Sequence, residues 1–270
     1  MFECVINLSE GRRTDVLNEL SRAAGASLRD RHHDAIHHRS VFTLINEPTQ
    51  LVADVRDLID AALVRLNLER HEGVHPRFGV VDVVPFVALD ASLTGHACEL
   101  RDDTARWLAT THAVPVFLYG ALEGGERSLP EVRRRAFSDL SPDFGPATAN
   151  PRWGASAVGC RPLLVAWNLW LEGVDLATAR AIALSLRRPG LRTLAFAVGV
   201  AVQVSCNVID VSAVSLSRVY DEAAARVPRG GRIARCELVG LAPRAVLEAE
   251  NRSRWAELDL SVERTIEARI

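Results

Sequence analysis

Residues 77–88, RFGVVDVVPFVA, carry a dense run of β-branched side chains around Asp82 and decide the fold of the first half of the chain. Such a run is typical of a buried strand. It follows Leu51–Leu66, where apolar residues recur at intervals of three and four and predict an amphipathic helix. The elements predicted before that helix are a strand at Glu3–Asn7, a helix that begins near Thr14 and is closed by Gly25, and strands at Ser27–Asp34 and Arg39–Asn46. The first half therefore runs β-α-β-β-α-β, the order of a ferredoxin-like unit.

The same order of elements restarts in the second half. Between the halves, Glu123–Pro151 is rich in Gly, Pro, Ser and Arg and predicts a loop with one short helix. The other predicted elements are a helix at Cys98–Thr110, strands at Val114–Tyr119 and Arg161–Leu169, a helix at Leu176–Leu186, strands at Arg192–Val200 and Gln203–Asp210, a helix at Ala213–Ala225 and a strand at Arg232–Val239. We predict an α+β protein of two ferredoxin-like (βαββαβ) subdomains that meet near residue 162, with a ligand crevice between them.

Composition and charge exclude several classes of function. The 270 residues carry a net charge of −2 without a basic surplus, so no nucleic-acid partner is expected. No apolar stretch approaches the ~20 residues that span a bilayer, and no signal-peptide pattern begins the chain, so we expect no membrane and a cytoplasmic location. All 32 basic residues are Arg, which excludes a lysine Schiff base and a Walker-type phosphate loop. Five scattered cysteines without a C-x-x-C pair indicate buried thiols in a reducing compartment.

Six of the eight histidines fall into two clusters, and the second contains a literal H-E-x-x-H from His71 to His75. In zinc proteases a helix places both imidazoles of this motif on one face. Here Gly73 lies inside the motif and Pro76 disfavours helical geometry at His75, so we predict a loop and no bound metal. For the first cluster, a polar hairpin with solvated side chains is an alternative to a functional role, and its members are His32, His33, His37 and His38.

The segment from His71 to Gly79 also fits an active-site loop. It packs an acid, imidazoles and a cation into a glycine-bounded stretch before a buried strand. Catalytic groups concentrate in loops of this kind, which a rigid scaffold positions. The alternative is that His75 is only a turn or capping residue, and from the residues alone both interpretations stay open.

Collinear segments across nearly the whole chain carry a family pattern. They are Glu3–Arg12 (ECVINLSEGR), His37–Val41 (HHRSV), His71–Arg77 (HEGVHPR), Val81–Phe86 (VDVVPF), Pro115–Tyr119 (PVFLY), Pro142–Pro146 (PDFGP), Trp153–Ala155, Gly159, Arg161, Gln203–Ser205, Asn207 and Glu237–Leu241 (ELVGL). H-x-G-x-H-P-R followed by P-D-F-G-P is a specific combination. With these segments the chain resembles the formiminotransferase domain found in glutamate formimidoyltransferases.

The resemblance implies an activity and a division of the chain. Residues 1–162 would be the N-terminal formiminotransferase subdomain and residues 163–270 a shortened C-terminal one, with folate bound between them. The implied reaction transfers a formimidoyl group from N-formimidoyl-L-glutamate to tetrahydrofolate, giving 5-formimidoyltetrahydrofolate and L-glutamate, in histidine degradation and one-carbon metabolism. Tetrahydrofolate is then a co-substrate, no metal is required, and the expected partners are folate and a glutamate-derived donor. The expected assembly is a homodimer.

Site residues are carried over from the matching motifs. The general-base histidine before Pro-Arg is His75. An imidazole with a pKa near 6.5 suits removal of the N5 proton of tetrahydrofolate. Both substrates carry carboxylates, which guanidinium forks bind, and the candidates are Arg77, Arg39 and Arg161. The folate-contacting segment comprises Gly145, Pro146, Ala147, Thr148, Ala149, Asn150, Pro151, Arg152, Trp153 and Gly154.

Three further polar residues have two open interpretations each. Asp82 could stabilise a cationic amidinium or serve as a hydrogen-bonding residue of its strand. Asn7 and Glu10 could orient a ligand or cap the following helix. If His75 is not the base, the remaining candidates are His37, His38 and His71.

The chain departs from the family pattern at several points. His38 stands where relatives usually have Asn, and Ile6 stands where they have Pro. The interval before P-D-F-G-P and the turn between the central strands of the second half are shortened, and the cyclodeaminase domain of some relatives is expected to be absent. The alternatives are therefore a family member with a different formimidoyl or formyl donor or acceptor amine, and a folate-binding protein without catalysis.

Overall fold

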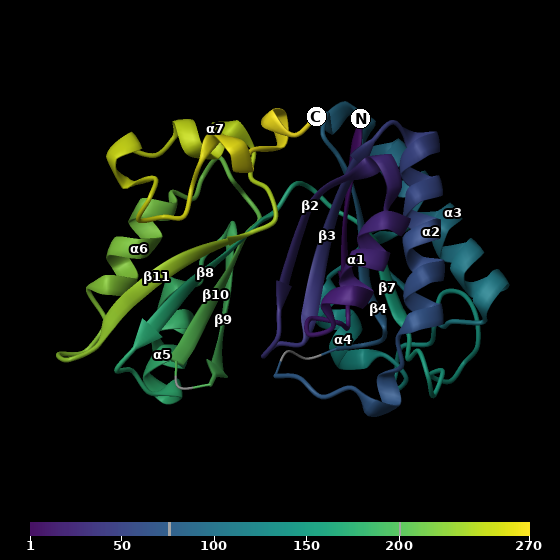
Figure 1. The fold of residues 1–270 in the computed structure, drawn as a ribbon, viewed down its shortest axis with the longest axis horizontal. Coiled ribbons are helices and arrows are strands. Elements are labelled where there is room, and N and C mark those ends of the chain that lie inside the picture. Colours follow the sequence, from purple (N-terminus) through teal and green to yellow (C-terminus); the bar gives the residue numbers. More distant parts are fainter. Residues whose placement is uncertain (75–76, 200) are drawn as a thin grey trace. The chain divides into compact units, whose positions relative to one another are not determined.

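The first unit of the chain, Met1–Pro162, is built around one mixed sheet (Figure 1). The computed structural model describes residues 1–74, 77–199 and 201–270. The elements of this unit are β1 (Phe2–Leu8), α1 (Thr14–Ala23), β2 (Leu28–Asp34), β3 (Arg39–Asn46), α2 (Pro48–Arg65), β4 (Val81–Ala88), α3 (Thr94–His112), β5 (Val116–Leu122), β6 (Gly125–Arg127), α4 (Leu129–Arg135) and β7 (Ser156–Cys160). The seven strands lie in the order β2-β3-β1-β4-β7-β5-β6.

The predicted β-α-β-β-α-β order of the first half is confirmed. Strands β2, β3, β1 and β4 form consecutive antiparallel pairs, with α1 and α2 as the two crossover helices. Strands β7 and β5 then extend the sheet beyond β4 in parallel register, and β6 closes that edge as a hairpin with β5. The first unit is therefore a ferredoxin-like motif enlarged on one side.

Strand β7 was not expected from the sequence, which predicted a strand at Arg161–Leu169 instead. The chain leaves the first sheet at Cys160 and enters the next strand only at Val165. Pro162 has no backbone N–H to donate to a ladder, which favours an interruption at this point. Because β7 is short and composed of small residues, its sequence carries little strand signal.

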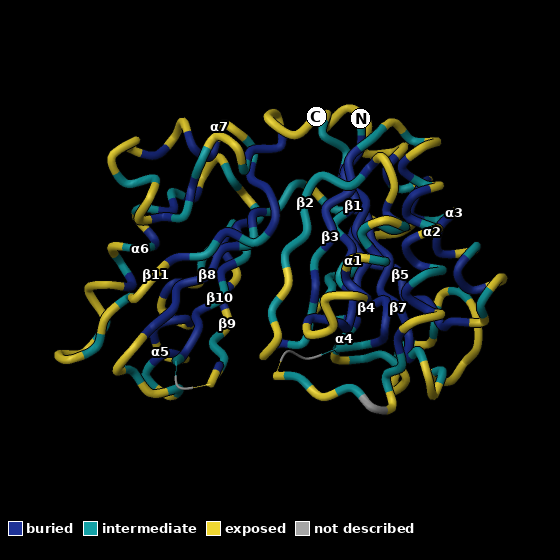
Figure 2. The backbone as a smooth tube through the Cα atoms, viewed as in Figure 1, coloured by how far each residue is buried: buried dark blue, intermediate teal, exposed yellow. Residues whose placement is uncertain are grey.

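Helices α1, α2 and α3 cover one face of the first sheet (Figure 1). Alternate residues of each strand point to that face, so Val116 and Leu118 pack with the helices while Phe117 and Tyr119 face the other way. On the second face a smaller apolar cluster forms with Val132 of α4. Strands β1, β4, β7 and the first part of β5 are consequently among the most buried parts of the unit (Figure 2).

The second unit, Leu163–Ile270, repeats the same topology in smaller form. Its elements are β8 (Val165–Glu172), α5 (Leu176–Leu186), β9 (Leu191–Val198), β10 (Ala201–Val208), α6 (Leu216–Ala224), β11 (Arg232–Val239) and α7 (Arg244–Glu248). Its antiparallel sheet has the order β11-β8-β10-β9, in which the first and third strands of the unit are the central pair. The α+β class with two ferredoxin-like subdomains is confirmed.

Several boundaries in the second unit differ from expectation by a few residues; β10, for example, is Ala201–Val208, whereas the predicted strand was Gln203–Asp210. The last predicted residue of the strand Arg192–Val200, Val200, lies outside the described residues. Helix α6 begins after Ser215, whose hydroxyl accepts the backbone N–H of Arg218 at 3.2 Å, whereas the predicted helix began at Ala213. None of the helices described in either unit has an apolar stretch long enough to cross a membrane. The crevice expected between the halves, and their assignment as transferase subdomains, stay predictions.

The junction of β5 and β7 requires glycine, which gives a test of the enlarged sheet. Gly120 has φ +84°, and a Cβ there would lie 1.7 Å from the carbonyl oxygen of Cys160. We expect Gly120→Ala to lower the free energy of unfolding of the first unit by about 2–4 kcal/mol. Gly95→Ala is the matched control, because its Cβ would meet nothing within 4 Å. Hydrogen exchange of β5 and β7 peptides measures the difference, and equal protection in the two variants would contradict the register.

Candidate active site

The candidate site lies where β1 ends and where β3 and β4 begin. The antiparallel register pairs Leu8 with both Ser40 and Val81, so these three strand ends are neighbours. The loop after β1, the turn before β3 and the loop before β4 therefore meet at one edge of the sheet. The sequence-predicted residues gathered there are Asn7, Glu10, His37, His38, Arg39, His71, Arg77 and Asp82.

Asp82 is a fully buried carboxylate at the centre of this cluster. Its Oδ2 accepts hydrogen bonds from Arg39 Nη1 at 2.5 Å and from Arg133 Nη2 at 2.6 Å, and its Oδ1 accepts the backbone N–H of Phe78 at 2.6 Å. Burial alone would raise the pKa of Asp82, but the charges and hydrogen bonds of the two guanidinium groups outweigh it and hold the pKa below its usual value. The carboxylate therefore stays ionised and fixes both arginines.

Asn7 continues this network to the next strand. Its Oδ1 accepts a hydrogen bond from Arg39 Nε at 3.1 Å, and its Nδ2 donates to the carbonyl of Val5 at 3.0 Å. The guanidinium of Arg39 is thus held on one side by Asp82 and on the other by Asn7. Because both partners lie on adjacent strands of a rigid sheet, the direction of this guanidinium is set by the backbone.

Glu10 caps the turn that precedes α1. It is fully buried, and its Oε1 accepts the backbone N–H groups of Arg12 at 2.8 Å and Arg13 at 2.9 Å. Burial raises the pKa of Glu10, but these bonds and the Arg13 guanidinium outweigh it and leave the pKa below its ordinary value. His38 Nδ1 lies 3.8 Å from Glu10 Oε1, so the cap also faces the histidine turn.

The turn before β3 carries His38 in a left-handed conformation, with φ 50°. The backbone N–H of Gly11 donates to His38 Nδ1 at 3.1 Å, which leaves the proton of a neutral ring on Nε2. The ring also lies against that of His71, with 4.0 Å between centroids. Burial lowers the pKa of His38 more than Glu10 raises it, so the ring favours its neutral form.

His71 holds the guanidinium of Arg77. Its Nε2 donates to the carbonyl of His38 at 2.9 Å, so its Nδ1 lone pair is the acceptor for Arg77 Nη1. Burial, followed by His38 and Arg77, lowers the pKa of His71 to about 4. Arg77 Nη2 also donates to the carbonyl of Gly73 at 2.6 Å. The neutral imidazole therefore works as a positioning group, and its Nδ1 lone pair is directed toward Arg77.

The predicted base, His75, lies with Pro76 outside the described residues. The residues before and after them are tied to the cluster. The backbone N–H of Val74 donates to the carbonyl of Ile36 at 3.3 Å, and Arg77 is held as described. His37, another candidate base, is 8% exposed, and its backbone N–H is accepted by Asp34 Oδ1 at 2.6 Å.

The predicted folate segment, residues 145–154, is mostly exposed but anchored at both ends. At the first end the backbone of Phe144 pairs with Val116, and at the other Asn150 and Gly154 exchange two backbone hydrogen bonds of 3.0 and 2.7 Å. Asn150 Oδ1 accepts the backbone N–H groups of Arg152 and Trp153, both at 3.0 Å. Gly154 bridges to Gly79, so this end of the segment adjoins the loop that carries Arg77.

Arg161 is not part of the cluster. Its backbone N–H donates to the carbonyl of Phe86, four residues along β4 from Asp82 and therefore roughly 13 Å away. Its charge acts instead on Glu3 and Tyr119. Burial raises the pKa of Glu3 to about 7, and Arg161 opposes that shift. The sheet thus carries a second group of titratable side chains farther along the strands.

Arg133 is the cluster member that sequence reasoning missed. It comes from α4, inside a segment predicted to be mainly loop, and lies 51 residues from Asp82 in the sequence. A row of three arginines, Arg133–Arg135, was the available signal, but spacing could not single out one of them. Its role follows only from the packing of α4 against β5.

A second polar cluster lies on the sheet of the second unit. Glu237 Oε2 accepts hydrogen bonds from Trp170 Nε1 at 2.9 Å and from Asn168 Nδ2 at 3.1 Å. Gln203 Nε2 donates to the same oxygen at 3.3 Å, and Arg235 lies over the Trp170 ring. Gln203 and Glu237 belong to matched family segments, and the structure joins them. Asn168 and Trp170 were not predicted as site residues.

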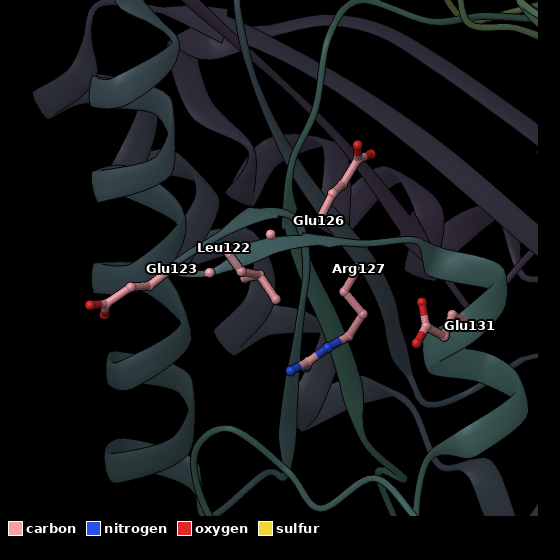
Figure 3. Close-up of a pocket in the computed structure, with 7 residues that line it drawn as sticks. Leu122, Glu123, Glu126, Arg127 and Glu131 are labelled. Atoms are coloured by element: carbon pink, nitrogen blue, oxygen red, sulfur yellow. The ribbon is translucent and has the colours of Figure 1, made fainter.

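Two further observations concern metal binding and a pocket outside the Asp82 cluster. Within residues 1–74, 77–199 and 201–270, no three His, Cys, Asp or Glu side chains gather as a metal site would require. A shallow pocket beside the β5–β6 hairpin is lined by Leu122, Glu123, Gly124, Gly125, Glu126, Arg127 and Glu131 (Figure 3). Glu123 and Glu126 point away from each other there, and Arg127 pairs with Asp143 at 2.7 Å.

Comparison with known proteins places these features in one family. The family described as "Formiminotransferase domain, N-terminal subdomain" matches residues 1–161. The "Glutamate formimidoyltransferase" of Streptococcus pyogenes serotype M1 is 31% identical over 92% of this chain and 90% of its own length. The protein of the same name from Thermoplasma acidophilum is 30% identical, with 92% of this chain and 89% of its own length covered.

A longer relative, whose name joins two activities, matches an equal share of this chain. The "Formimidoyltransferase-cyclodeaminase" of Sus scrofa is 32% identical over 92% of this chain. The chain spans about half, 51%, of the length of that relative. The family match over more than half of the chain, with two relatives at 30% identity or above and covered almost fully, decides the assignment. The chain belongs to the formiminotransferase domain family.

Proposed function

We propose that this protein is a transferase that moves a formimidoyl group from N-formimidoyl-L-glutamate to tetrahydrofolate, giving 5-formimidoyltetrahydrofolate and L-glutamate. The carrying observation is its similarity, over 92% of the chain, to proteins named glutamate formimidoyltransferase. Residues 163–270 then serve as the C-terminal subdomain of the transferase. The reaction belongs to histidine degradation, with tetrahydrofolate as co-substrate. The predicted cytoplasmic location and homodimeric assembly stay predictions.

In the proposed reaction, N5 of tetrahydrofolate attacks the amidine carbon of the donor. The bond between that carbon and the glutamate nitrogen then breaks, N5 loses its proton, and the departing nitrogen gains one. His75 is the proposed base for the N5 proton, because a positioned imidazole suits this transfer. The contacts of Val74 and Arg77, which tie both sides of His75 to the cluster, support this role.

Arg39 and Arg77 are the proposed carboxylate-binding groups of the first unit. Both guanidinium groups are oriented by fixed partners, Asp82 for Arg39 and His71 for Arg77. Pre-orientation of this kind reduces the entropy lost when a carboxylate binds. Asp82 is then a positioning residue, as are Asn7 and Glu10 through their backbone and side-chain bonds. Arg161 would meet a different part of a bound ligand, because it lies farther along β4.

Folate binding is assigned to residues 145–154. Their exposure and their anchorage next to Gly79 support contact with a ligand that also reaches the Arg77 loop. A different formimidoyl or formyl donor is the alternative for the second substrate. The observation that favours it is His38, which replaces the usual Asn and lies against both Gly11 and His71.

The two loop residues should fail differently when replaced. His75→Ala should lower kcat by roughly 10²–10⁴ with little change in tetrahydrofolate affinity, because a proton transfer is lost. Arg77→Ala should mainly raise the KM for the donor, because a carboxylate contact is lost. Steady-state kinetics with formimidoylglutamate and tetrahydrofolate tests both. Wild-type turnover in His75→Ala would refute the base assignment, whereas an inactive wild type that still binds folate would refute the reaction.

The low pKa of His71 predicts a pH-dependent stability. Its neutral form accepts the Arg77 hydrogen bond, and its pKa of about 4 lies below the ordinary value of 6.5. The unfolded chain therefore binds the proton more readily, so the contribution is complete above pH 6.5 and is lost as pH falls toward 4. His71→Asn does not titrate and is the reference. As pH falls, the free energy of unfolding of the wild type should decrease more steeply than that of the variant, and the extra slope should correspond to the uptake of at most about one proton. Urea unfolding at stepped pH measures this, and parallel curves would contradict it.

The Asn150 side chain offers a test of the folate segment. Asn150→Ala removes the acceptor for the backbone N–H groups of Arg152 and Trp153 and should loosen the loop. We expect the KM for tetrahydrofolate to rise by roughly 5–30-fold, equivalent to the 1–2 kcal/mol of such bonds, with the donor KM nearly unchanged. Asn251→Ala, which removes a comparable acceptor for the backbone N–H of Ser253 outside this segment, is the control. An equal rise in both KM values would argue against a folate-specific loop.

A further inference from the structure

Two cysteines of the first unit lie within reach of covalent bonding. Cys98 lies on α3 and Cys160 is the last residue of β7, and their Sγ atoms are 2.6 Å apart. A disulfide needs about 2.05 Å, so a shift of roughly half an ångström would close the bond. Helix α3 packs directly on β7, so two rigid elements maintain this proximity.

The two sulfurs differ in their access to an oxidant. Cys98 is half-buried, whereas Cys160 is 2% exposed and also contacts the carbonyl of Thr94 at 3.7 Å. Burial, followed by the contact with Cys98, raises the pKa of the Cys160 thiol to about 12. Cys160 therefore stays a protonated thiol, and Cys98 is the sulfur that a dissolved oxidant meets first.

The other cysteines have no comparable arrangement among the described residues. Cys4, Cys206 and Cys236 are all buried. Cys4 lies on β1 in the first unit, and the other two belong to the second unit. The thiol-to-thiol contact recorded in the described part of the chain is that of Cys98 with Cys160.

We propose that Cys98 and Cys160 are an oxidant-responsive pair that forms a reversible intramolecular disulfide with peroxide. In the first step the Cys98 sulfur attacks one peroxide oxygen, the O–O bond breaks, and Cys98 sulfenic acid and water result. In the second step the Cys160 sulfur attacks the Cys98 sulfur, the S–O bond breaks, and the proton of the Cys160 thiol passes to the departing hydroxide, which leaves as a second water. Two thiols are oxidised by two electrons and one peroxide is reduced to two waters. Excess dithiol reverses the bond by exchange.

The bond would fasten the end of β7 to α3. Cys160 precedes the end of the first unit, Pro162, by two residues, and the partners are separated by 62 positions in sequence. Closing a loop of this length restricts the unfolded chain and raises stability. The oxidised first unit should therefore unfold at a temperature higher by roughly 5–10 °C. This inference is independent of the proposed transferase activity.

The test is peptide mapping of the whole chain after mild oxidation. The reduced protein is treated with one equivalent of hydrogen peroxide, alkylated under denaturing conditions and digested without reductant. We expect a linked Cys98–Cys160 peptide pair, a mass lower by two hydrogens and recovery of both free thiols with dithiothreitol. Cys98→Ala should abolish the link and the rise in unfolding temperature, whereas Cys206→Ala should keep both.

The wild-type map decides the matter even if a variant folds poorly. Cys98 carrying sulfinic acid beside a fully alkylated Cys160 would overturn the proposal. A disulfide that instead uses Cys4, Cys206 or Cys236, or one that joins two molecules, would overturn it as well. A linked pair without any change in unfolding temperature would refute the stabilising role.

Discussion

A carboxylate without exposed surface must be neutralised by its surroundings, and the Asp82 carboxylate governs the candidate site for this reason. Its two oxygens accept hydrogen bonds from Arg39 of β3, from Arg133 of α4 and from the backbone N–H of Phe78 in the loop before β4. Removing the carboxylate would leave two guanidinium groups close together without compensation. The directions of Arg39 and Arg133 and the path of the loop that precedes β4 therefore all involve one side chain.

The histidine cluster extends this arrangement through hydrogen bonds made by the neutral rings of His38 and His71. Gly11 donates to His38, His38 offers its carbonyl to His71, and His71 accepts from Arg77. The first and last of these links use a ring lone pair that exists only while the imidazole is neutral. The low pKa of His71 is thus a condition for the position of Arg77. Burial and, to a smaller extent, the charge of Arg77 keep the neighbouring imidazoles uncharged.

Much of the frame was predictable from local patterns. Leu51–Leu66 has a clear helical periodicity. The strands at Arg39–Asn46 and Arg232–Val239 and the helix at Leu176–Leu186 were predicted with their observed bounds. The enlargement of the first sheet was not predictable. The strand β7 lies between β4 and β5, which precede it in the chain, and it consists of small residues. Its stability comes from its parallel neighbours, from burial of Val158 and Cys160 in the core and from close approaches such as Gly120 to Cys160.

The sequence by itself determined the alternation of strands and helices, the family resemblance and the segments that carry chemistry, because these depend on residue type and spacing along the chain. The tertiary structure alone decided which of those residues meet. It joined Arg133 to Asp82, separated Arg161 from the cluster and brought Cys98 beside Cys160. The physical reason is that strand order and register, set by packing between distant segments, determine which strand ends become neighbours. Spacing along one chain contains no direct measure of that order.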